Sequence, residues 1–193
     1  MNIEILSITP NAEQLIEQAG RTCYQSTIGN PSIIRAWIKA GHESVVEHAS
    51  ATFRISEISR ACSHQLVRHR LASYSQQSQR YVEDGDFDYV MPQSIAMDKF
   101  MSQEYLRMMS YIKMMYKDFI GNGIKKEDAR MILPNACHTE IVMTANMREW
   151  RSILKLRCDK HAQWEIREMA TDILLSLAIQ CPNVFADLAE LYL

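Results

Sequence analysis

The longest periodic pattern in the chain, residues 97–120, constrains the fold most strongly. Its apolar side chains recur at the spacing of one helical face, and Gly121 and Gly123 follow directly, as is typical of a helix end. Residues 97–120 are therefore predicted to form a long amphipathic helix whose apolar surface exceeds what one small core requires. Its apolar stripe consists of Met101, Tyr105, Met108, Ile112, Met115 and Phe119.

Seven of the twelve methionines fall between residues 91 and 115. Methionine side chains are flexible, so this segment suits either an adaptable surface for a partner or a filler of the core or of a subunit interface. We favour the second interpretation.

The rest of the chain alternates between short strand patterns and helical patterns. In residues 49–55, Ala51, Phe53 and Ile55 alternate with polar residues, which indicates a half-buried strand. Because the strands and helices are interspersed, we expect an α+β fold: a single domain over 1–193 with a modest central, mostly antiparallel sheet packed by long helices. The expected strands are 3–8, 49–55 and 137–145, and the other expected helices are 11–19, 31–41, 57–69, 126–131, 148–156 and 164–180.

Composition excludes several classes of protein. Of the 193 residues, 47% are hydrophobic and 23% are charged, which argues against a disordered chain and a disulfide scaffold. The net charge of −2 gives no overall attraction to nucleic acid or to an anionic membrane. Five scattered cysteines without a CxxC pair suit reduced thiols. No stretch is apolar enough to span a membrane, and we expect a cytoplasmic protein.

Residues 68–81, Arg-His-Arg-Leu-Ala-Ser-Tyr-Ser-Gln-Gln-Ser-Gln-Arg-Tyr, form the densest polar segment. It contains three arginines, three serines and three glutamines but no carboxylate. Guanidinium groups suit phosphate oxygens, while amides and hydroxyls suit the edge of a heterocycle. The segment therefore predicts an anion-binding loop. The alternative is a solvated loop whose arginines pair with distant carboxylates.

Two further clusters carry less weight. His42 and His48 are six residues apart, whereas a zinc-binding helix needs histidines four apart, so we expect no metal site. Cys137 precedes His138 in a possible nucleophile segment, but it also opens an apolar strand. A buried structural thiol is the favoured interpretation of Cys137.

Arg148 and Arg157 are nine residues apart and cannot share one helical face, unless the helix ends near Arg157 and the chain turns back. Asp159-Lys160 supports such an end. Arg157 would then face a cleft or, alternatively, complement the dipole of its helix.

Several of these segments together resemble the flavin-dependent thymidylate synthases. The family signature Arg-His-Arg-x-x-Ser, with a following Ser-x-Arg-Tyr, is present in 68–81. The segments Gly-His-Glu-x-x-x-Glu-His at 41–48, Arg-x-x-Leu-Pro at 130–134 and 146–165 match the same family in the same order. The resemblance spans roughly residues 40–170.

The resemblance implies reductive methylation of dUMP to dTMP, with methylenetetrahydrofolate as carbon donor, FAD as hydride carrier and NADPH as reductant, in a homotetramer with active sites between subunits. By position, the FAD-binding residues would be His42, Ser44, Arg68, His69, Arg70, Leu71, Gln76, Asn146, Met147, Arg148 and Ser152. Those that bind dUMP would be Gln65, Arg68, Gln76, Gln77, Ser78, Gln79, Arg80, Arg130 and Arg157.

Arg157 matches the arginine that activates the pyrimidine, so no cysteine nucleophile is expected. Some relatives carry Glu where this chain has Gln76, and Asn where it has Ser152. Gln76 keeps hydrogen bonding without the charge, and Ser152 lacks the reach of an amide.

A non-catalytic nucleotide- or RNA-binding module is the main competing interpretation. Only Tyr74 and Tyr81 offer stacking rings beside the basic cluster, and the chain has no overall positive charge. A purely structural helical protein would not explain why separate segments match one family in order.

Overall fold

The computed structural model describes residues 1–27, 29–81 and 85–193. Within these residues, contacts divide the chain into two compact units. The first unit comprises Met1–Ile55, Gln65–Ser75 and Val142–Leu193, and the second comprises Ser56–His64 and Gln76–Ile141. The single domain over 1–193 stays a prediction.

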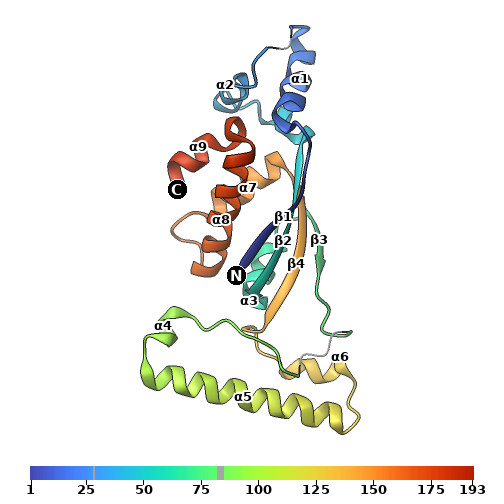
Figure 1. Cartoon of the computed structure of the whole chain (residues 1–193), viewed down its shortest axis with the longest axis vertical. Coiled ribbons are helices and arrows are strands. Elements are labelled where there is room, and N and C mark those ends of the chain that lie inside the picture. The colour runs from blue at the N-terminus through green and yellow to red at the C-terminus, as the bar shows by residue number, and fades with distance from the viewer. Residues whose placement is uncertain (28, 82–84) are drawn as a thin grey trace. The chain divides into compact units, whose positions relative to one another are not determined.

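Among the described residues, four strands form one antiparallel sheet in the order β1-β2-β4-β3 (Figure 1). The predicted α+β class is therefore confirmed. The strands are β1 (Asn2–Ile8), β2 (Ser50–Ser59), β3 (Ser73–Gln76) and β4 (His138–Asn146). The helices are α1 (Ala12–Tyr24), α2 (Ile33–Lys39), α3 (Arg60–Leu66), α4 (Gln93–Ala96), α5 (Lys99–Gly121), α6 (Lys126–Ala129), α7 (Met147–Arg157), α8 (Trp164–Gln180) and α9 (Pro182–Tyr192), with 3-10 turns η1 (Glu43–His48) and η2 (Arg130–Ile132).

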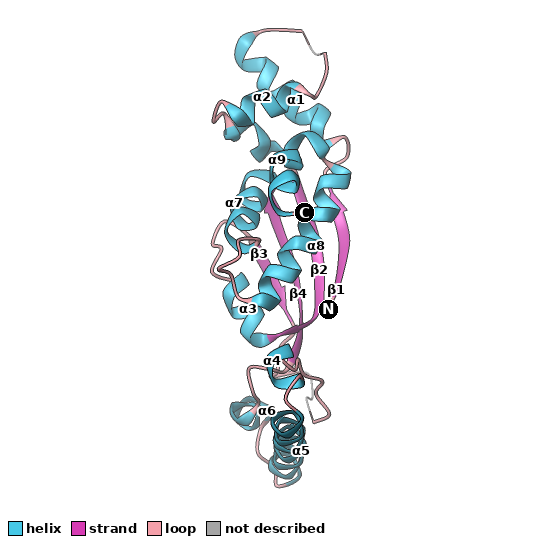
Figure 2. Cartoon of the chain, turned by 90° about the vertical axis from the view of Figure 1, so that its left-hand side faces the viewer, coloured by secondary structure: helices cyan, strands magenta, loops and turns pink. Residues whose placement is uncertain are grey.

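The core of the first unit lies between its part of the sheet and the helices α7, α8 and α9, which cover one face (Figure 2). Phe53 of β2 meets Trp150 of α7 edge to face, with ring centroids 5.1 Å apart, and both side chains are fully buried. The indole Nε1 of Trp150 donates to the carbonyl oxygen of Ala51 at 3.1 Å. This contact fixes α7, the helix that carries Arg148 and Arg157, against β2.

The expected helix over 57–69 is wrong at its start. β2 continues to Ser59, and α3 covers only Arg60–Leu66. The hydroxyl of Ser59 accepts a hydrogen bond from the amide of Cys62 at 3.0 Å, so Ser59 occupies the capping position of α3. The following polar loop also contains an unexpected strand, β3.

In the second unit, α5 presents two different apolar surfaces. Tyr105 and Ile112 pack on a small core formed by Phe87, Met109 and Cys137. Met101 and Met108, expected on the same stripe, are instead more than half exposed. The apolar residues of α5 thus cover more of the helix circumference than its own core uses.

All five cysteines belong to the described residues and are free thiols, four of them buried and Cys23 exposed. Cys137 is buried, as expected for a structural thiol. In addition, burial raises the pKa of Cys158 to about 11 and that of Cys181 to about 12. No helix within the described residues is long and apolar enough to cross a membrane.

Candidate active site

A cavity of 630 Å³ lies at the start of α7 in the first unit, and we call it the α7 cavity. Its size is within the range of small-molecule and cofactor sites. Four of the residues predicted to bind FAD line it, and they come from two separate segments of the chain. The lining residues are Glu43, Glu47, Leu71, Asn146, Arg148, Glu149, Ser152 and Lys155.

The N-terminus of α7 borders this cavity. The side chain of Asn146 accepts a hydrogen bond from the amide of Glu149 at 2.8 Å and so caps the helix. The first turn of a helix carries positive potential, and Arg148 adds a full charge there. Arg148 is ion-paired with Glu47 in the same wall. The cavity therefore combines cationic, amide and carboxylate groups with the exposed side chain of Leu71.

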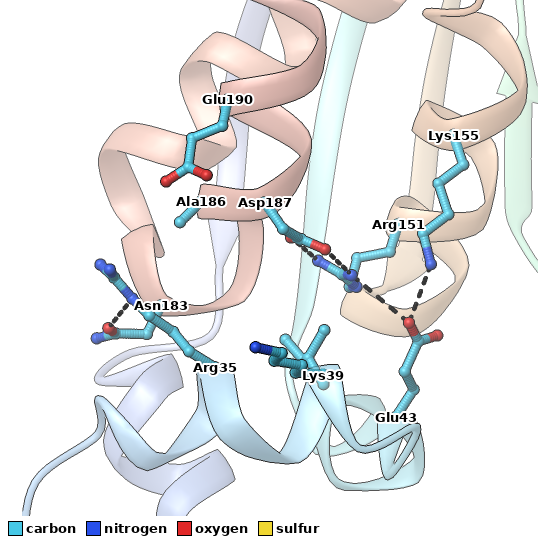
Figure 3. Close-up of a pocket in the computed structure, with 10 residues that line it drawn as sticks. Arg35, Lys39, Glu43, Arg151, Lys155, Asn183, Ala186, Asp187 and Glu190 are labelled. Carbon is cyan, nitrogen blue, oxygen red and sulfur yellow. Dashed lines mark hydrogen bonds and ion pairs between the residues drawn. The ribbon is translucent and has the colours of Figure 1, made fainter.

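A fully buried arginine, Arg151 of α7, connects α7 to η1 and to α9 (Figure 3). Its guanidinium donates twice to the carboxylate of Asp187, both at 2.7 Å, and once to the carbonyl oxygen of Val184. Glu43 lies 3.5 Å from Arg151 and 3.0 Å from Lys155. Because Glu43 lines the α7 cavity, the Arg151 network sets the position of η1 against α7.

Two carboxyl groups of this network, those of Asp187 and Glu43, have lowered pKa values. Burial alone would raise the pKa of Asp187, but the hydrogen bonds and charge of Arg151 outweigh it, so the pKa is lowered from 3.8. For Glu43, burial is likewise outweighed, by Lys155 and Arg151, and the pKa is lowered from 4.5. Both groups are thus held in the ionised form. A second cavity of 340 Å³ adjoins them, lined also by Arg35, Lys39 and Glu190 (Figure 3).

Arg157 is the last residue of α7, as the expected helix end requires. Its Nε donates to Nε2 of His69 at 3.0 Å, and its Nη2 donates to the carbonyl oxygen of Gln65 at 3.0 Å. The structure thereby brings together Gln65, His69 and Arg157, all three predicted from the sequence. Burial and the nearby charge of Arg157 lower the pKa of His69 to about 4, so His69 is neutral at pH 7.

The other predicted residues of the first unit are distributed around these groups. His42 and Ser44 flank the start of η1, and Arg68 and Arg70 lie in the turns after α3; all four are exposed. Met147 is different, because its side chain is fully buried and its amide donates to the carbonyl oxygen of Ala49 at 2.8 Å. A contact from the Met147 side chain to FAD would require the core to open.

In the second unit, Arg80 and Arg130 meet at one residue, Glu127. Nη2 of Arg80 lies 3.2 Å from the Glu127 carboxylate, and Nε of Arg130 donates to the Glu127 carbonyl oxygen at 3.1 Å. The hydroxyl of Ser78 accepts from the amide of Arg80 at 3.2 Å. Two of the arginines predicted to bind dUMP are thus adjacent.

The glutamines of this loop have separate roles. The Gln76 amide donates to the hydroxyls of Ser63, at 2.8 Å, and Thr139, at 3.1 Å. Gln76 thus ties the loop to α3 and β4, and a carboxylate in its place could not make these donations. Gln77 is exposed. Gln79 is only 9% exposed, and its Nε2 has no hydrogen-bond partner among the described residues.

Sequence reasoning missed the carboxylates at the site. Glu43 and Glu47 lie in the quoted motif at 41–48, but only the fold shows that they face α7 and pair with Lys155 and Arg148. Glu149 also lines the cavity, and its position in the first turn of the helix would have been the signal. Among the residues that the structure describes, no group of three or more His, Cys, Asp or Glu is arranged to hold a metal ion.

Comparison with known proteins decides the family. Residues 4–183 match the family model Thy1, described as thymidylate synthase complementing protein. The chain belongs to this family. The resemblance inferred from the segments at 41–48, 68–81, 130–134 and 146–165 is therefore confirmed.

Curated relatives agree over most of the chain. A flavin-dependent thymidylate synthase of Geobacter sulfurreducens is 43% identical over 202 residues, covering 97% of this chain and 86% of the relative. One from Clostridium tetani is 35% identical and covers 96% of this chain and 85% of the relative. One from Pyrococcus furiosus is 46% identical over 142 residues, covering 72% of this chain and 58% of the relative.

Proposed function

We propose that this protein is a flavin-dependent thymidylate synthase. It converts dUMP to dTMP, with methylenetetrahydrofolate as carbon donor, FAD as hydride carrier and NADPH as reductant. The observation that carries this proposal is the α7 cavity, which is lined by Leu71 together with Asn146, Arg148 and Ser152. Leu71 is distant in sequence from the other three, and all four are among the residues that the family resemblance assigns to FAD.

The residues of the α7 cavity fit a flavin nucleotide. Leu71, which is 79% exposed, offers an apolar surface to a ring system, and Asn146 and Ser152 offer polar side chains. Arg148 and the N-terminus of α7 suit a phosphate, which would compete with Glu47 for the guanidinium. FAD bound there supplies the hydride that completes the methyl group. We propose His42, Ser44, Arg68, His69, Arg70 and Gln76 as further contacts of the cofactor.

Arg157 is the proposed catalytic residue. A guanidinium beside the pyrimidine ring stabilises the negative charge that develops as C5 becomes nucleophilic. Because His69 and Gln65 already orient the side chain, little reorganisation is needed when the charge forms. Cys137 is buried, so we assign it no nucleophilic role.

Residues of the second unit are proposed to bind dUMP. Arg80 and Arg130 provide adjacent cationic groups, and Ser78 provides a hydroxyl. The unsatisfied amide Nε2 of Gln79 supports a ligand, because buried polar groups rarely lack a partner. We propose Gln76 and Gln77 as further contacts. The adjacent arginines suit the phosphate of the nucleotide.

We further propose that the protein is a cytoplasmic homotetramer. α5 exposes an apolar surface, the α5 stripe, formed by Phe100, Met101, Met108, Tyr111 and Met114, each more than half exposed. Glu104 and Arg107 lie on the same side of the helix and form an ion pair with each other, so they add no net charge to the stripe. An apolar face without net charge suits packing against the same face of a second copy. Free buried thiols suit a reducing compartment.

Sedimentation tests the assembly. Met108→Glu with Tyr111→Glu should dissociate the tetramer and reduce dTMP formation, whereas Ser110→Glu, an exposed position outside the stripe, should preserve it. A stripe variant that remains tetrameric would remove the α5 stripe from the interface.

Flavin binding tests the proposed function. The purified protein should bind FAD, and Arg148→Ala should weaken this binding, measured by equilibrium dialysis. Arg54→Ala, which removes an exposed ion pair with Glu4, should bind FAD normally. A protein that binds RNA but neither FAD nor dUMP would instead be the non-catalytic module considered above.

A further inference from the structure

A row of three side chains connects the α7 cavity to Arg157. Glu149, which lines the cavity, has its carboxylate oxygen Oε1 3.9 Å from Nδ1 of His69, and both side chains are nearly buried. The opposite ring nitrogen, Nε2, accepts the hydrogen bond from Nε of Arg157 at 3.0 Å. All three residues belong to the first unit.

This arrangement determines where His69 carries its proton. A guanidinium can only donate hydrogen bonds, so Nε2 of His69 must be the unprotonated nitrogen. Since the pKa of His69 is lowered to about 4, the ring is neutral at pH 7, and its single proton lies on Nδ1. The Nδ1–H group therefore lies on the side of the ring that faces Glu149.

Glu149 favours this tautomer electrostatically. At 3.9 Å the pair is too long for a direct hydrogen bond, but the attraction between a carboxylate and an N–H dipole persists at this distance. In the other tautomer, the lone pair of Nδ1 would face the carboxylate, and two N–H groups would face each other between His69 and Arg157. Both changes are unfavourable.

The other charged groups around Glu149 have their own partners. In the α7 cavity, Arg148 is paired with Glu47 and Lys155 with Glu43. From β3, Tyr74 donates its hydroxyl to the carbonyl oxygens of Leu66 and His69. Burial and the charge of Glu149 raise the pKa of Tyr74 to about 12, so it stays neutral. Glu149 thus remains as the carboxylate for which an ion-pair distance to the ring of His69, 3.9 Å, is found among the described residues.

We propose that Glu149 is a positioning residue for the thymidylate-forming reaction: it keeps His69 in the Nδ1–H tautomer, and His69 in turn orients the guanidinium of Arg157. This inference rests on the role proposed above for Arg157. It assigns Glu149 no contact with dUMP, and Glu149 lines the α7 cavity proposed for FAD.

The tautomer can be measured directly on the full chain. Long-range ¹H–¹⁵N spectra of histidine-labelled protein, with His69 assigned by its substitution, distinguish the two ring nitrogens. The wild type and the control Glu168→Gln, an exposed carboxylate on α8, should show Nδ1–H. Glu149→Leu should shift His69 toward Nε2–H, and Glu149→Gln, which keeps the shape, serves if the Leu variant does not fold. An unchanged tautomer in a folded Glu149 variant would overturn the proposal.

Kinetics separate positioning from a structural role. Partners that orient metal-bound histidines typically change affinity or activity by about 10- to 100-fold when removed. By analogy, Glu149→Gln should lower turnover at saturating dUMP about tenfold. With FAD saturating, the KM for dUMP should not change, and Glu149→Asp should recover part of the turnover. Full turnover in Glu149→Gln would refute the role of Glu149. Full turnover in Arg157→Ala would instead refute the proposed function of Arg157, while the tautomer measurement would still stand.

Discussion

Substitution of Arg157 should separate the two half-reactions of the enzyme. Arg157→Ala removes a guanidinium that is held by two hydrogen bonds of 3.0 Å, to His69 and to Gln65. Loss of one such preorganised donor typically costs about 10²–10³ in turnover, or about 2.7–4 kcal/mol. We therefore expect dTMP formation at saturating dUMP to fall by about a hundredfold or more. Flavin reduction by NADPH should remain largely intact.

The conservative variant sharpens this prediction. Arg157→Lys should recover only part of the turnover, because one ammonium group cannot reproduce the planar fork that bonds His69 and Gln65 together. Stopped-flow absorbance measures flavin reduction, and chromatography of quenched reactions measures dTMP. Arg54→Ala, at an exposed ion pair, is the matched control. Equal loss of both half-reactions in Arg157→Ala would indicate a damaged flavin site or fold, and the activating role would be refuted.

Three further predictions concern binding, thiols and stability. Arg80→Ala should weaken dUMP binding by about tenfold, which is the lower end for loss of a charge-assisted hydrogen bond, because Arg80 must leave Glu127 to bind a phosphate. Calorimetry measures the affinity for dUMP, and an unchanged affinity would exclude Arg80 from the dUMP site. Cys137→Ala should keep dTMP formation, because Cys137 is buried. A folded variant that binds FAD and dUMP but forms no dTMP would show that Cys137 acts as a nucleophile. Asp187→Asn should destabilise the protein by about 2 kcal/mol in denaturant unfolding at pH 7, less than for a fully buried pair because Asp187 is half-exposed. The folded-state pKa of Asp187 is lowered, so the difference in stability between the variant and the wild type should be present above the ordinary pKa of 3.8. This difference should disappear as the pH falls from 3.8 through the lowered pKa. A difference in stability that persists at low pH would contradict its origin in the ion pair.

The sequence predicts elements best where one buried face dominates. The expected helix 164–180 matches α8, because Ile166, Met169 and Ile173 repeat at helical spacing and are buried. The strand β3 is missed, because Ser73–Gln76 has no apolar pattern of its own and forms through pairing with its neighbour, β4. The helix α9 was also not anticipated, although Pro182 at its first turn is a helix-start signal.

The candidate site shows the same limit. The segment at 68–81 and the end of the helix at Arg157 are local features, and both could be predicted from the sequence. The partners of these residues could not. Glu149 lies eighty positions from His69 and Glu43 lies 108 positions from Arg151, so only the folded chain pairs them. Charged side chains pair with the residues that the fold brings near them, and no periodic pattern in the sequence predicts these partners.

The source of the hydride tests the central claim most directly. If FAD supplies the hydride that completes the methyl group, redox balance requires that the folate leave as tetrahydrofolate and that dTMP form only when NADPH can reduce the flavin. The measurement is quantification of dTMP and of both reduced folates after anaerobic incubation of the protein with FAD, dUMP and methylenetetrahydrofolate, with and without NADPH. The account predicts dTMP and tetrahydrofolate in equal amounts, and only with NADPH. Formation of dTMP with dihydrofolate, independent of NADPH, or no dTMP at all, would contradict it.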